Sequence, residues 1–520
     1  MKRRQLIYVA WAAIFIFAMA LRLPGLTQRP MHTDEAVHAI KFSDLLERNN
    51  YRYDPHEYHG PTLNYFTLIP AWLTGAKTLS AASEITLRIV PAFFGLLLIP
   101  LIWLLSPWLN RSTLLWMSLF TAISPALSYY SRYYIMEMML LAFTLGWLVV
   151  WLRYWRDPKI SWLITGAISL GLMMATKETW ILNAIAALAA TGLILIQSNN
   201  SRMLLSDGIQ RIPQFHFIIA PIAVLFVAGL FFSSFGSNWH GLIDAVRAYS
   251  VYFRRAEGST TVHEHPWYYY AHLLLWYKMR NGPLWSEGII VLLASWGVVQ
   301  TFRKSISENP VDRWIACYTL VLAVIYSIIP YKTPWNLLSF WQPIILLAGI
   351  GWTAVFRLNR SWKKWMIIGI GSCGILHLGW QSWQANFRYA ASPANPYVYG
   401  HTSPDIFRIV GAVHTATKAD NGDQTYIEVI CPNDDYWPLP WYFRKYPNVG
   451  YWNHVSMKTP AAPIIIVAPV VEQSLLNKLY VQPPPGQRPL YVPLIDSSTE
   501  LRPGVELRSY VIKALWDRMR

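Results

Sequence analysis

Charged residues are scarce in this sequence. Asp, Glu, Lys and Arg make up 14% of the 520 residues, whereas hydrophobic residues make up 54% and aromatic residues 15%. An ordinary soluble domain carries about 25% charged residues. The shortage therefore excludes that class and indicates a chain that crosses a membrane many times.

Acidic residues and cysteines are also few. The chain has 28 acids against 44 Lys and Arg, which gives a formal net charge of +16. In a membrane protein such an excess first marks loops that stay in the cytoplasm, so no nucleic-acid partner is expected. The three cysteines, Cys317, Cys373 and Cys431, lie in two apolar segments and a polar tail, and they predict no disulfide framework. No internal repeat is visible, which weighs against transporters built from two related halves.

Long apolar runs are abundant. The first, 6–23, follows the basic start "MKRRQ" and precedes no small-residue cleavage pattern, so it predicts a retained helix that begins in the cytoplasm. Runs of roughly spanning length recur along the chain, for eleven predicted spans in all. The later ones are 86–106, 112–129, 135–155, 160–176, 179–197, 215–234, 285–302, 313–330, 336–356 and 363–381.

A further apolar run, 61–76, is long enough to raise the question of a twelfth span. If it does not cross, the basic loops fall on one side with 16 Lys and Arg, and the short turns on the other side hold Arg132, Lys177 and Lys332. If 61–76 crosses the membrane, the later basic loops lie outside, which is the reverse of the positive-inside rule. The positive-inside rule therefore predicts an interfacial helix on the outer face, with Tyr65 and Trp72 at the headgroup level.

The predicted fold is a polytopic α-helical membrane protein with about eleven transmembrane helices, interfacial helices and a small C-terminal α/β domain. The membrane domain covers 1–384, with outer loops at 27–85 and 235–284, and the extracytoplasmic domain covers 385–520. In this tail "TYIEVI" and "APIIIVAP" predict strands and "VEQSLLNKLYV" predicts a helix. The segment 433–443, "NDDYWPLPWYF", is typical of sugar binding or, more simply, of a packed aromatic cluster.

Unusual polar residues gather on the outer side of this topology. Asp34 and Glu35 lie side by side in the first outer loop, and Glu137 lies just inside the outer end of a span. An ionisable group within a span is costly unless it has a partner or faces a wet cavity, so Glu137 is a candidate site residue. Asp34 has a structural alternative, because an acid in the first turn of a helix is favoured by the helix dipole.

The basic candidates have structural alternatives as well. Arg132 and Glu137 are close enough in sequence to form an ion pair at the interface. Lys177 and Lys332 are suited to anchor helix ends by snorkelling.

The outer loop 235–284 contains Arg254, Arg255 and the run "VHEHPWYYYAH". His263 and His265 are two residues apart and do not face each other on a helix, so a metal site is weakly supported. The aromatic residues of the run are more typical of a membrane-interface belt than of a sugar-stacking surface.

The order of several motifs resembles a known group of enzymes. "TDEA" in the first outer loop, "HGPTLNYF" at the start of the interfacial helix, and "SPALSYYSRYYIMEMMLLAF" follow one another, with "GLMMATKETW" and "YKTPWNLLSFW" later. This ordered set resembles the GT-C superfamily of membrane glycosyltransferases. The likeness is to the branch of protein O-mannosyltransferases and lipid A aminoarabinose transferases, and it is clearest over about 5–200.

The resemblance implies roles for several residues. It implies that Asp34 is the catalytic base, that Glu35 completes the acidic pair, and that Glu137 is a second acid. The aminoarabinose branch has a Lys where the interfacial helix begins, whereas this chain has His59, so the ligand of the donor phosphate stays open among His59, Arg255 and Lys332. Arg132 and Lys177 are further candidates for substrate binding.

The function implied is inverting transfer of a sugar from a polyprenyl-phosphate donor to an acceptor hydroxyl on a protein, lipid or glycan. The resemblance places such an enzyme in the inner (plasma) membrane, among membrane lipids, with its site facing the periplasm. It implies no particular cofactor, and a divalent metal is only weakly supported. The alternatives are a flippase or transporter for lipid-linked sugars and a non-catalytic partner that has kept the fold.

Overall fold

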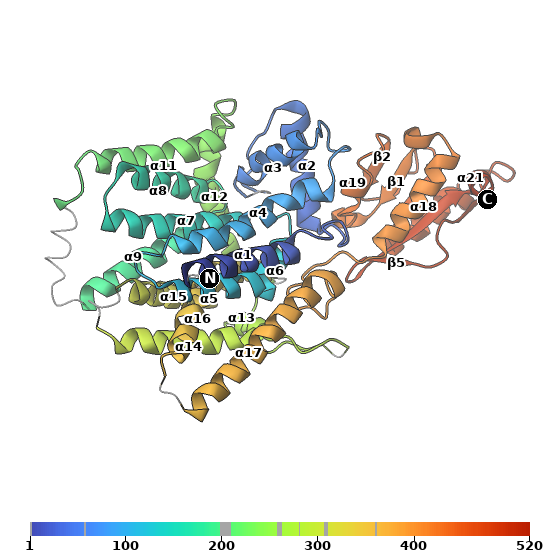
Figure 1. The fold of residues 1–520 in the computed structure, drawn as a ribbon. Helices are drawn as coiled ribbons and strands as arrows, with labels where there is room; N and C mark the ends of the chain where they lie inside the picture. Colours follow the sequence, from blue (N-terminus) through green and yellow to red (C-terminus); the bar gives the residue numbers. More distant parts are fainter. Residues whose placement is uncertain are drawn as a thin grey trace.

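The computed structural model describes residues 3–56, 59–197, 210–256, 263–279, 281–305, 310–358 and 361–520. Each of the eleven predicted apolar segments forms a helix. These are α1 (Arg3–Arg22), α4 (Glu84–Trp103), α5 (Arg111–Ile123), α7 (Glu137–Arg156), α8 (Ile160–Met174), α9 (Trp180–Gln197), α11 (His216–Phe232), α14 (Gly288–Arg303), α15 (Pro310–Ile328), α16 (Leu338–Val355) and α17 (Trp362–Trp383). Figure 1 shows them gathered in one helical body, beside which the C-terminal sheet domain lies.

Within these described ranges, six helical stretches are long and apolar enough to cross a membrane by length and composition: Gln5–Arg22, Glu84–Trp103, Glu137–Arg156, Trp180–Gln197, Pro310–Ile328 and Pro334–Val355. Helices α8, α11 and α14 are apolar but shorter. The multi-pass architecture is therefore confirmed. The count of eleven crossings stays a prediction.

The segment predicted to lie at the interface forms α3 (Thr62–Leu73), a helix of 12 residues. Pro61 precedes it, and Gly75 follows it with φ +71°, a conformation that glycine adopts without strain. At 1.5 Å per residue α3 is about 18 Å long, well short of the roughly 30 Å of a bilayer's hydrocarbon core. Helix α3 alone is too short to span, and its position on the outer face stays a prediction.

Further helices lie between these apolar ones: α2 (Thr33–Arg48), α6 (Pro125–Tyr130), α12 (His240–Ala256), α13 (Tyr269–Leu275) and the 3-10 helix η2 (Pro334–Leu337). Helix α16 packs against α5, α14 and α15, while α7 packs between α4 and α8. The α14–α16 contact is close, because a Cβ at Gly351 would lie 1.9 Å from the carbonyl oxygen of Leu293. Small residues at such contacts let two helix backbones approach within a membrane.

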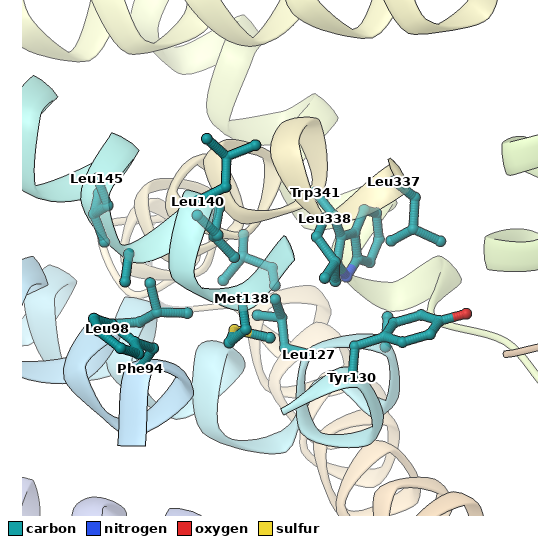
Figure 2. Close-up of a cluster of buried hydrophobic side chains, with 14 of the residues drawn as sticks. Phe94, Leu98, Leu127, Tyr130, Met138, Leu140, Leu145, Leu337, Leu338 and Trp341 are labelled. Atoms are coloured by element: carbon teal, nitrogen blue, oxygen red, sulfur yellow. The ribbon is translucent and has the colours of Figure 1, made fainter. Parts of the chain in front are cut away.

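The core of the helical body lies where α4, α6, α7 and α16 meet. Figure 2 shows this cluster, in which Phe94 and Leu98 of α4 face Met138 of α7, and Trp341 of α16 lies near Leu127 of α6. All of these side chains are buried. Helix α7 therefore has a fixed place in the core, and so has the residue at its start, Glu137.

The tail forms a mixed six-stranded sheet in the order β2-β1-β3-β6-β4, with β5 paired to β6. Strands β1 and β2 and strands β1 and β3 are parallel, whereas β3, β4 and β5 pair with β6 in antiparallel fashion. The strands are β1 (Ile427–Ile430), β2 (Val449–Trp452), β3 (Ile464–Val467), β4 (Tyr491–Pro493), β5 (Thr499–Arg502) and β6 (Val505–Ile512). Helices α18 (Ile406–Ala419), α19 (Leu439–Tyr442), α20 (Pro469–Leu476) and α21 (Lys513–Met519) accompany the sheet, as do the 3-10 helices η4 (Gly422–Gln424) and η5 (Pro432–Asp434) and the π-helix η6 (Asn477–Val481). The π-helix η3 (Gln384–Arg388) instead continues α17 and contacts α6 in the helical body. The predicted α/β tail is confirmed.

The aromatic segment of the tail docks the sheet domain onto the helical body. Trp441 is buried, and its Nε1 donates to Glu84 at 2.8 Å. Arg444 donates to the carbonyls of Leu79 and Ala82 at 3.1 and 2.8 Å. These contacts favour the packed aromatic cluster over a sugar-binding surface for 433–443.

Candidate functional site

A cavity of about 360 Å³ lies where α2, α7, the α8–α9 turn and the α15–α16 turn come together. This volume falls within the range typical of small-molecule sites, about 300–1,000 Å³. The lining includes acids, one lysine, histidines and aromatic rings. Its residues are Asp34, His38, His59, Ile135, Met136, Glu137, Lys177, Glu178, Thr179, Ile181, Leu182, Tyr249, Tyr326, Ile329, Tyr331, Thr333, Trp335 and Asn336.

Asp34 reaches this cavity because of how α2 begins. His32 caps the helix, accepting a hydrogen bond from the backbone N–H of Asp34 at 3.1 Å, while Glu35 accepts one from the backbone N–H of His32 at 2.9 Å. The side chain of Asp34 is 45% exposed. Its carboxylate is therefore presented to the cavity at a fixed helix end.

Glu35 lies on the opposite side of the same turn and is fully buried. It accepts hydrogen bonds from Arg29 at 2.8 Å, from Arg88 at 2.8 Å and from the backbone N–H of Tyr134 at 2.8 Å. Burial alone would raise the pKa of Glu35, but the two guanidiniums outweigh it and hold that pKa well below its usual range. Glu35 thus joins α2, α4 and the 131–136 turn, and it does not line the cavity.

Replacing Glu35 by Gln should therefore lower stability more than replacing Asp34 by Asn. The amide keeps the shape but removes the charge that two buried arginines share. Hydrogen bonds to charged groups are worth about 1.5–3 kcal/mol each, so we expect a loss of about 2–3 kcal/mol in the free energy of unfolding. Thermal unfolding of purified Glu35→Gln and Asp34→Asn in the same detergent tests this. Equal melting temperatures for the two variants would contradict it.

Glu137 and Lys177 form a buried pair on another wall of the cavity. The Nζ of Lys177 donates to Oε1 of Glu137 at 2.6 Å and to Oδ1 of Asn336 at 3.2 Å. Oε2 of Glu137 is buried and has no hydrogen-bond partner among the residues that the structure describes. Burial alone would lower the pKa of Lys177, but the carboxylate of Glu137 outweighs it and raises that pKa. Lys177 is therefore a charged ammonium.

The motif "HGPT" packs against the turn that carries Lys177. A Cβ at Gly60 would lie 2.2 Å from the carbonyl oxygen of Ala175, so only glycine allows this approach. The hydroxyls of Thr62 and Thr176 lie 2.8 Å apart. This contact brings His59 to Glu178, with Nδ1 and Oε2 2.7 Å apart.

The remaining predicted residues lie elsewhere. Arg132 forms no pair with Glu137, and that expectation is wrong. Its guanidinium donates instead to the carbonyls of Arg22, Pro24 and Gly25 at 3.1, 2.6 and 2.9 Å, because the end of α1 presents carbonyls without helical partners.

Lys332 does not line the cavity, although its neighbours Tyr331 and Thr333 do. It is buried, and its Nζ donates to the carbonyls of Ile329 and His265. Arg255 lies near the end of α12, and its side chain falls outside the described residues.

The histidines of the outer loop form contacts with aromatic residues. His263 Nδ1 lies 2.8 Å from the hydroxyl of Tyr399, and His265 stacks on Tyr269 at 4.0 Å. Within the part of the chain that the structure describes, no group of three or more His, Cys, Asp or Glu side chains could hold a metal.

Sequence reasoning missed His38 as a lining residue, although it lies four residues after Asp34 and so on the same helix face. Burial lowers the pKa of His38 to about 4. Among the groups around it, Asp34 and Glu137 raise the pKa, and His59 and Lys177 lower it. His38 is therefore neutral at pH 7 in the folded protein.

This gives His38 a measurable effect on stability. The pKa of His38 is near 6.5 in the unfolded chain, above its value in the folded protein, so the unfolded chain binds a proton first as the pH falls. The free energy of unfolding therefore loses nothing from His38 above pH 6.5 and decreases as the pH drops toward 4. Between pH 7 and pH 5 we expect about 2 kcal/mol of loss from this group. The variant His38→Gln should unfold with a smaller pH dependence over that range. Parallel melting curves of wild type and His38→Gln across it would refute this.

Comparisons with known proteins agree with this architecture. Residues 12–235 match the model of the family described as dolichyl-phosphate-mannose-protein mannosyltransferase. A search among curated proteins gives no match.

Solved structures show the same fold over nearly the whole chain. ArnT from Cupriavidus metallidurans, in its apo state, is similar at 13% identity and a TM-score of 0.61, covering 96% of this chain and 98% of that one. The structure of the same enzyme bound to undecaprenyl phosphate is similar at 14% identity and a TM-score of 0.62, with the same coverage of both chains. An oligosaccharyltransferase from Archaeoglobus fulgidus, tethered with an acceptor peptide, is similar at 11% identity and a TM-score of 0.55. The match covers 86% of this chain and 64% of that one. The predicted resemblance to membrane-embedded glycosyltransferases is confirmed.

Proposed function

Because the chain has the GT-C fold and its residues 12–235 match a mannosyltransferase family, we propose that it is a membrane glycosyltransferase. It transfers a sugar from a polyprenyl-phosphate donor to an acceptor hydroxyl in the cavity described above. One observation carries the proposal: an exposed carboxylate, Asp34, and a buried ammonium, Lys177, line the same cavity.

The two groups suit the two demands of the reaction. Asp34 takes the proton of the acceptor hydroxyl while that oxygen attacks the anomeric carbon from the side opposite the phosphate. The bond between the anomeric carbon and the phosphate oxygen breaks, and polyprenyl phosphate leaves with the bonding electrons. Lys177 stabilises the negative charge that develops on this phosphate. Attack from the opposite side inverts the anomeric centre.

Glu137 and Asn336 orient Lys177 for this role. Both accept hydrogen bonds from its Nζ, which fixes the long side chain against the cavity wall. Tyr331 and Trp335 supply aromatic rings in the same cavity. Concave sites of this kind combine apolar walls with a few polar groups that fix the ligand's orientation.

The position of the cavity relative to the membrane suits a polyprenyl-phosphate donor. Glu137 is the first residue of α7, a helix of 20 residues and so about 30 Å long. The cavity therefore lies at one end of a bilayer-length helix, where the phosphate of a lipid-linked sugar also lies. The structure of ArnT with undecaprenyl phosphate supports this donor class.

We also propose that the cavity faces the extracytoplasmic side of the inner membrane, with the tail above it. The tail reaches the start of α2, where the carbonyl of Tyr399 lies 2.9 Å from Nε2 of His32 and the hydroxyl of Thr402 donates to the carbonyl of Met31 at 2.6 Å. The tail is thus positioned to contact an acceptor, which is a protein, a lipid or a glycan.

A transporter is less consistent with the charge distribution. Carriers of polar cargo place ionisable residues along a path through the membrane. Here the buried charges of the candidate spans, Arg22, Arg88, Glu137 and Asp312, each lie within five residues of a helix end.

The test compares cells with and without the gene product by mass spectrometry of glycans and lipid-linked sugars. Loss of one glycan together with accumulation of its polyprenyl-phosphate sugar supports transfer. The purified protein in nanodiscs should then release polyprenyl phosphate from that donor. Unchanged glycan synthesis in permeabilised membranes, with the lipid-linked sugar retained on one leaflet of intact cells, would indicate transport instead.

A further inference from the structure

A second pocket, of about 380 Å³, lies at the other end of α7. Six residues line it, from the α4–α5 loop, the end of α7 and the start of α8: Ser106, Pro107, Arg153, Arg156, Asp157 and Trp162. Sixteen residues separate Glu137 from Arg153, so about 24 Å of helix axis lies between the cavity and this pocket. It is a separate site and does not depend on the proposed transfer reaction.

Two arginines are held in this pocket by backbone carbonyls. Nε of Arg153 donates to the carbonyl of Leu104 at 2.7 Å, and Nη2 approaches the hydroxyl of Ser106 at 3.4 Å. Nη1 of Arg156 donates to the carbonyl of Pro107 at 3.3 Å. A guanidinium has five N–H donors in a fixed fork, so both side chains keep donors for a ligand.

The pocket carries an excess of positive charge. Within the described part of the chain, neither arginine forms an ion pair, and the acid of the pocket, Asp157, pairs with Lys159 at 2.7 Å. Both guanidinium carbons also lie within 6 Å of the ring centroid of Trp108. Two neighbouring arginines that are not paired with a carboxylate can each donate two hydrogen bonds to a phosphate group.

Exposed apolar side chains lie at the same level of the molecule, in the last two turns of α7 and at the start of α8. Trp151, Trp155 and Ile160 are each more than 40% exposed in the same turn region. Tryptophan at the end of a bilayer-length helix marks the headgroup level of a membrane. The phosphate group expected here is therefore one that carries acyl chains.

We infer that this pocket binds the phosphodiester headgroup of an anionic phospholipid, at the membrane surface opposite the cavity. The phosphate lies between Arg153 and Arg156, and its acyl chains run from there into the membrane alongside α8, which begins at the exposed Ile160. Ser106 and Asp157 are placed to hydrogen-bond a headgroup hydroxyl. Basic pockets between helices near a membrane surface are known to take such headgroups.

The test is native mass spectrometry of the full chain in detergent, titrated with phosphatidylglycerol. We expect the double variant Arg153→Gln, Arg156→Gln to bind the most tightly held phosphatidylglycerol molecule at least tenfold more weakly than the wild type does. A charge-matched control, Arg303→Gln with Arg357→Gln, removes two exposed arginines outside this pocket and should leave that binding unchanged. The single variant Arg156→Gln keeps the hydrogen bond from Arg153 to the carbonyl of Leu104. It should therefore fold normally and still bind the lipid more weakly, which distinguishes lost binding from lost folding.

Three further arms identify the ligand. Phosphatidylcholine should bind at least tenfold more weakly than phosphatidylglycerol, and inorganic phosphate at the same concentration should not displace the lipid. Equal binding of phosphatidylcholine, or displacement by inorganic phosphate, would overturn the anionic-lipid assignment. Wild-type affinity in the double pocket variant would overturn the site itself.

Discussion

Asp34→Asn should lower the rate of sugar transfer by about 10²–10⁴-fold, the usual contribution of a general base. The amide keeps the size of the side chain and removes the group that accepts the proton. Nothing in the contacts of Asp34 predicts a large change in folding, because the carboxylate is 45% exposed and lies in the first turn of α2. A charge at that position contributes only about 0.3–1 kcal/mol to stability.

The assay measures release of polyprenyl phosphate by protein in nanodiscs. Asp44→Asn is the matched control, because Asp44 lies on the same helix, is about one-third exposed, pairs with Lys41 and Arg48, and does not line the cavity. It should retain wild-type turnover. Donor affinity, measured without acceptor, should be similar in both variants. Turnover at the wild-type rate by Asp34→Asn would end its assignment as the base and would favour a non-catalytic binding partner.

The helices were predictable because their signal is local. Runs of apolar residues about twenty long need no partner to be recognised, and each predicted run is a helix here. The strands β1 and β3 were predictable for the same reason, since "IIIV" is a continuous apolar segment, "IEVI" is apolar apart from Glu428, and both are buried throughout.

The partners of the charged residues were not predictable. Arg132 and Glu137 are near each other in sequence, but Glu137 pairs with Lys177, which lies 40 residues further along the chain. Glu35 is enclosed by Arg29 and Arg88, the second from α4. A charge in a sequence does not show whether a carboxylate, a carbonyl or a cavity will face it, and this depends on tertiary packing.

Lys332 illustrates the same limit. Its place in an outer turn fits a phosphate ligand, but the carbonyls of His265 and Ile329 take up its ammonium in the structure. The motif "ATKET" holds the lysine that reaches the cavity, and it does so because "HGPT" packs against it. The order of these motifs in the chain was informative, whereas the roles of single residues required the fold.

Lys177→Met should have the largest effect on stability among the site variants. It leaves the carboxylate of Glu137 buried without a charged partner, which typically costs about 3–5 kcal/mol. Adding Glu137→Gln removes that buried charge, so the double variant should recover most of the lost stability. Thermal unfolding of the two single variants and the double variant gives the interaction energy between Lys177 and Glu137 as a double-mutant cycle.

Activity should not follow stability in this set. The double variant folds but has no cation for the departing phosphate, so its donor KM should rise and its kcat should fall by about 10²-fold or more, as when one charge-stabilising donor is lost. Lys332→Met is the control, because that lysine is also buried but donates to backbone carbonyls and does not line the cavity. It should keep the donor KM of the wild type even if it melts earlier. A raised donor KM in Lys332→Met, with an unchanged one in the Lys177 variants, would move the phosphate site to the 263–265 loop and leave the Lys177–Glu137 pair a structural role.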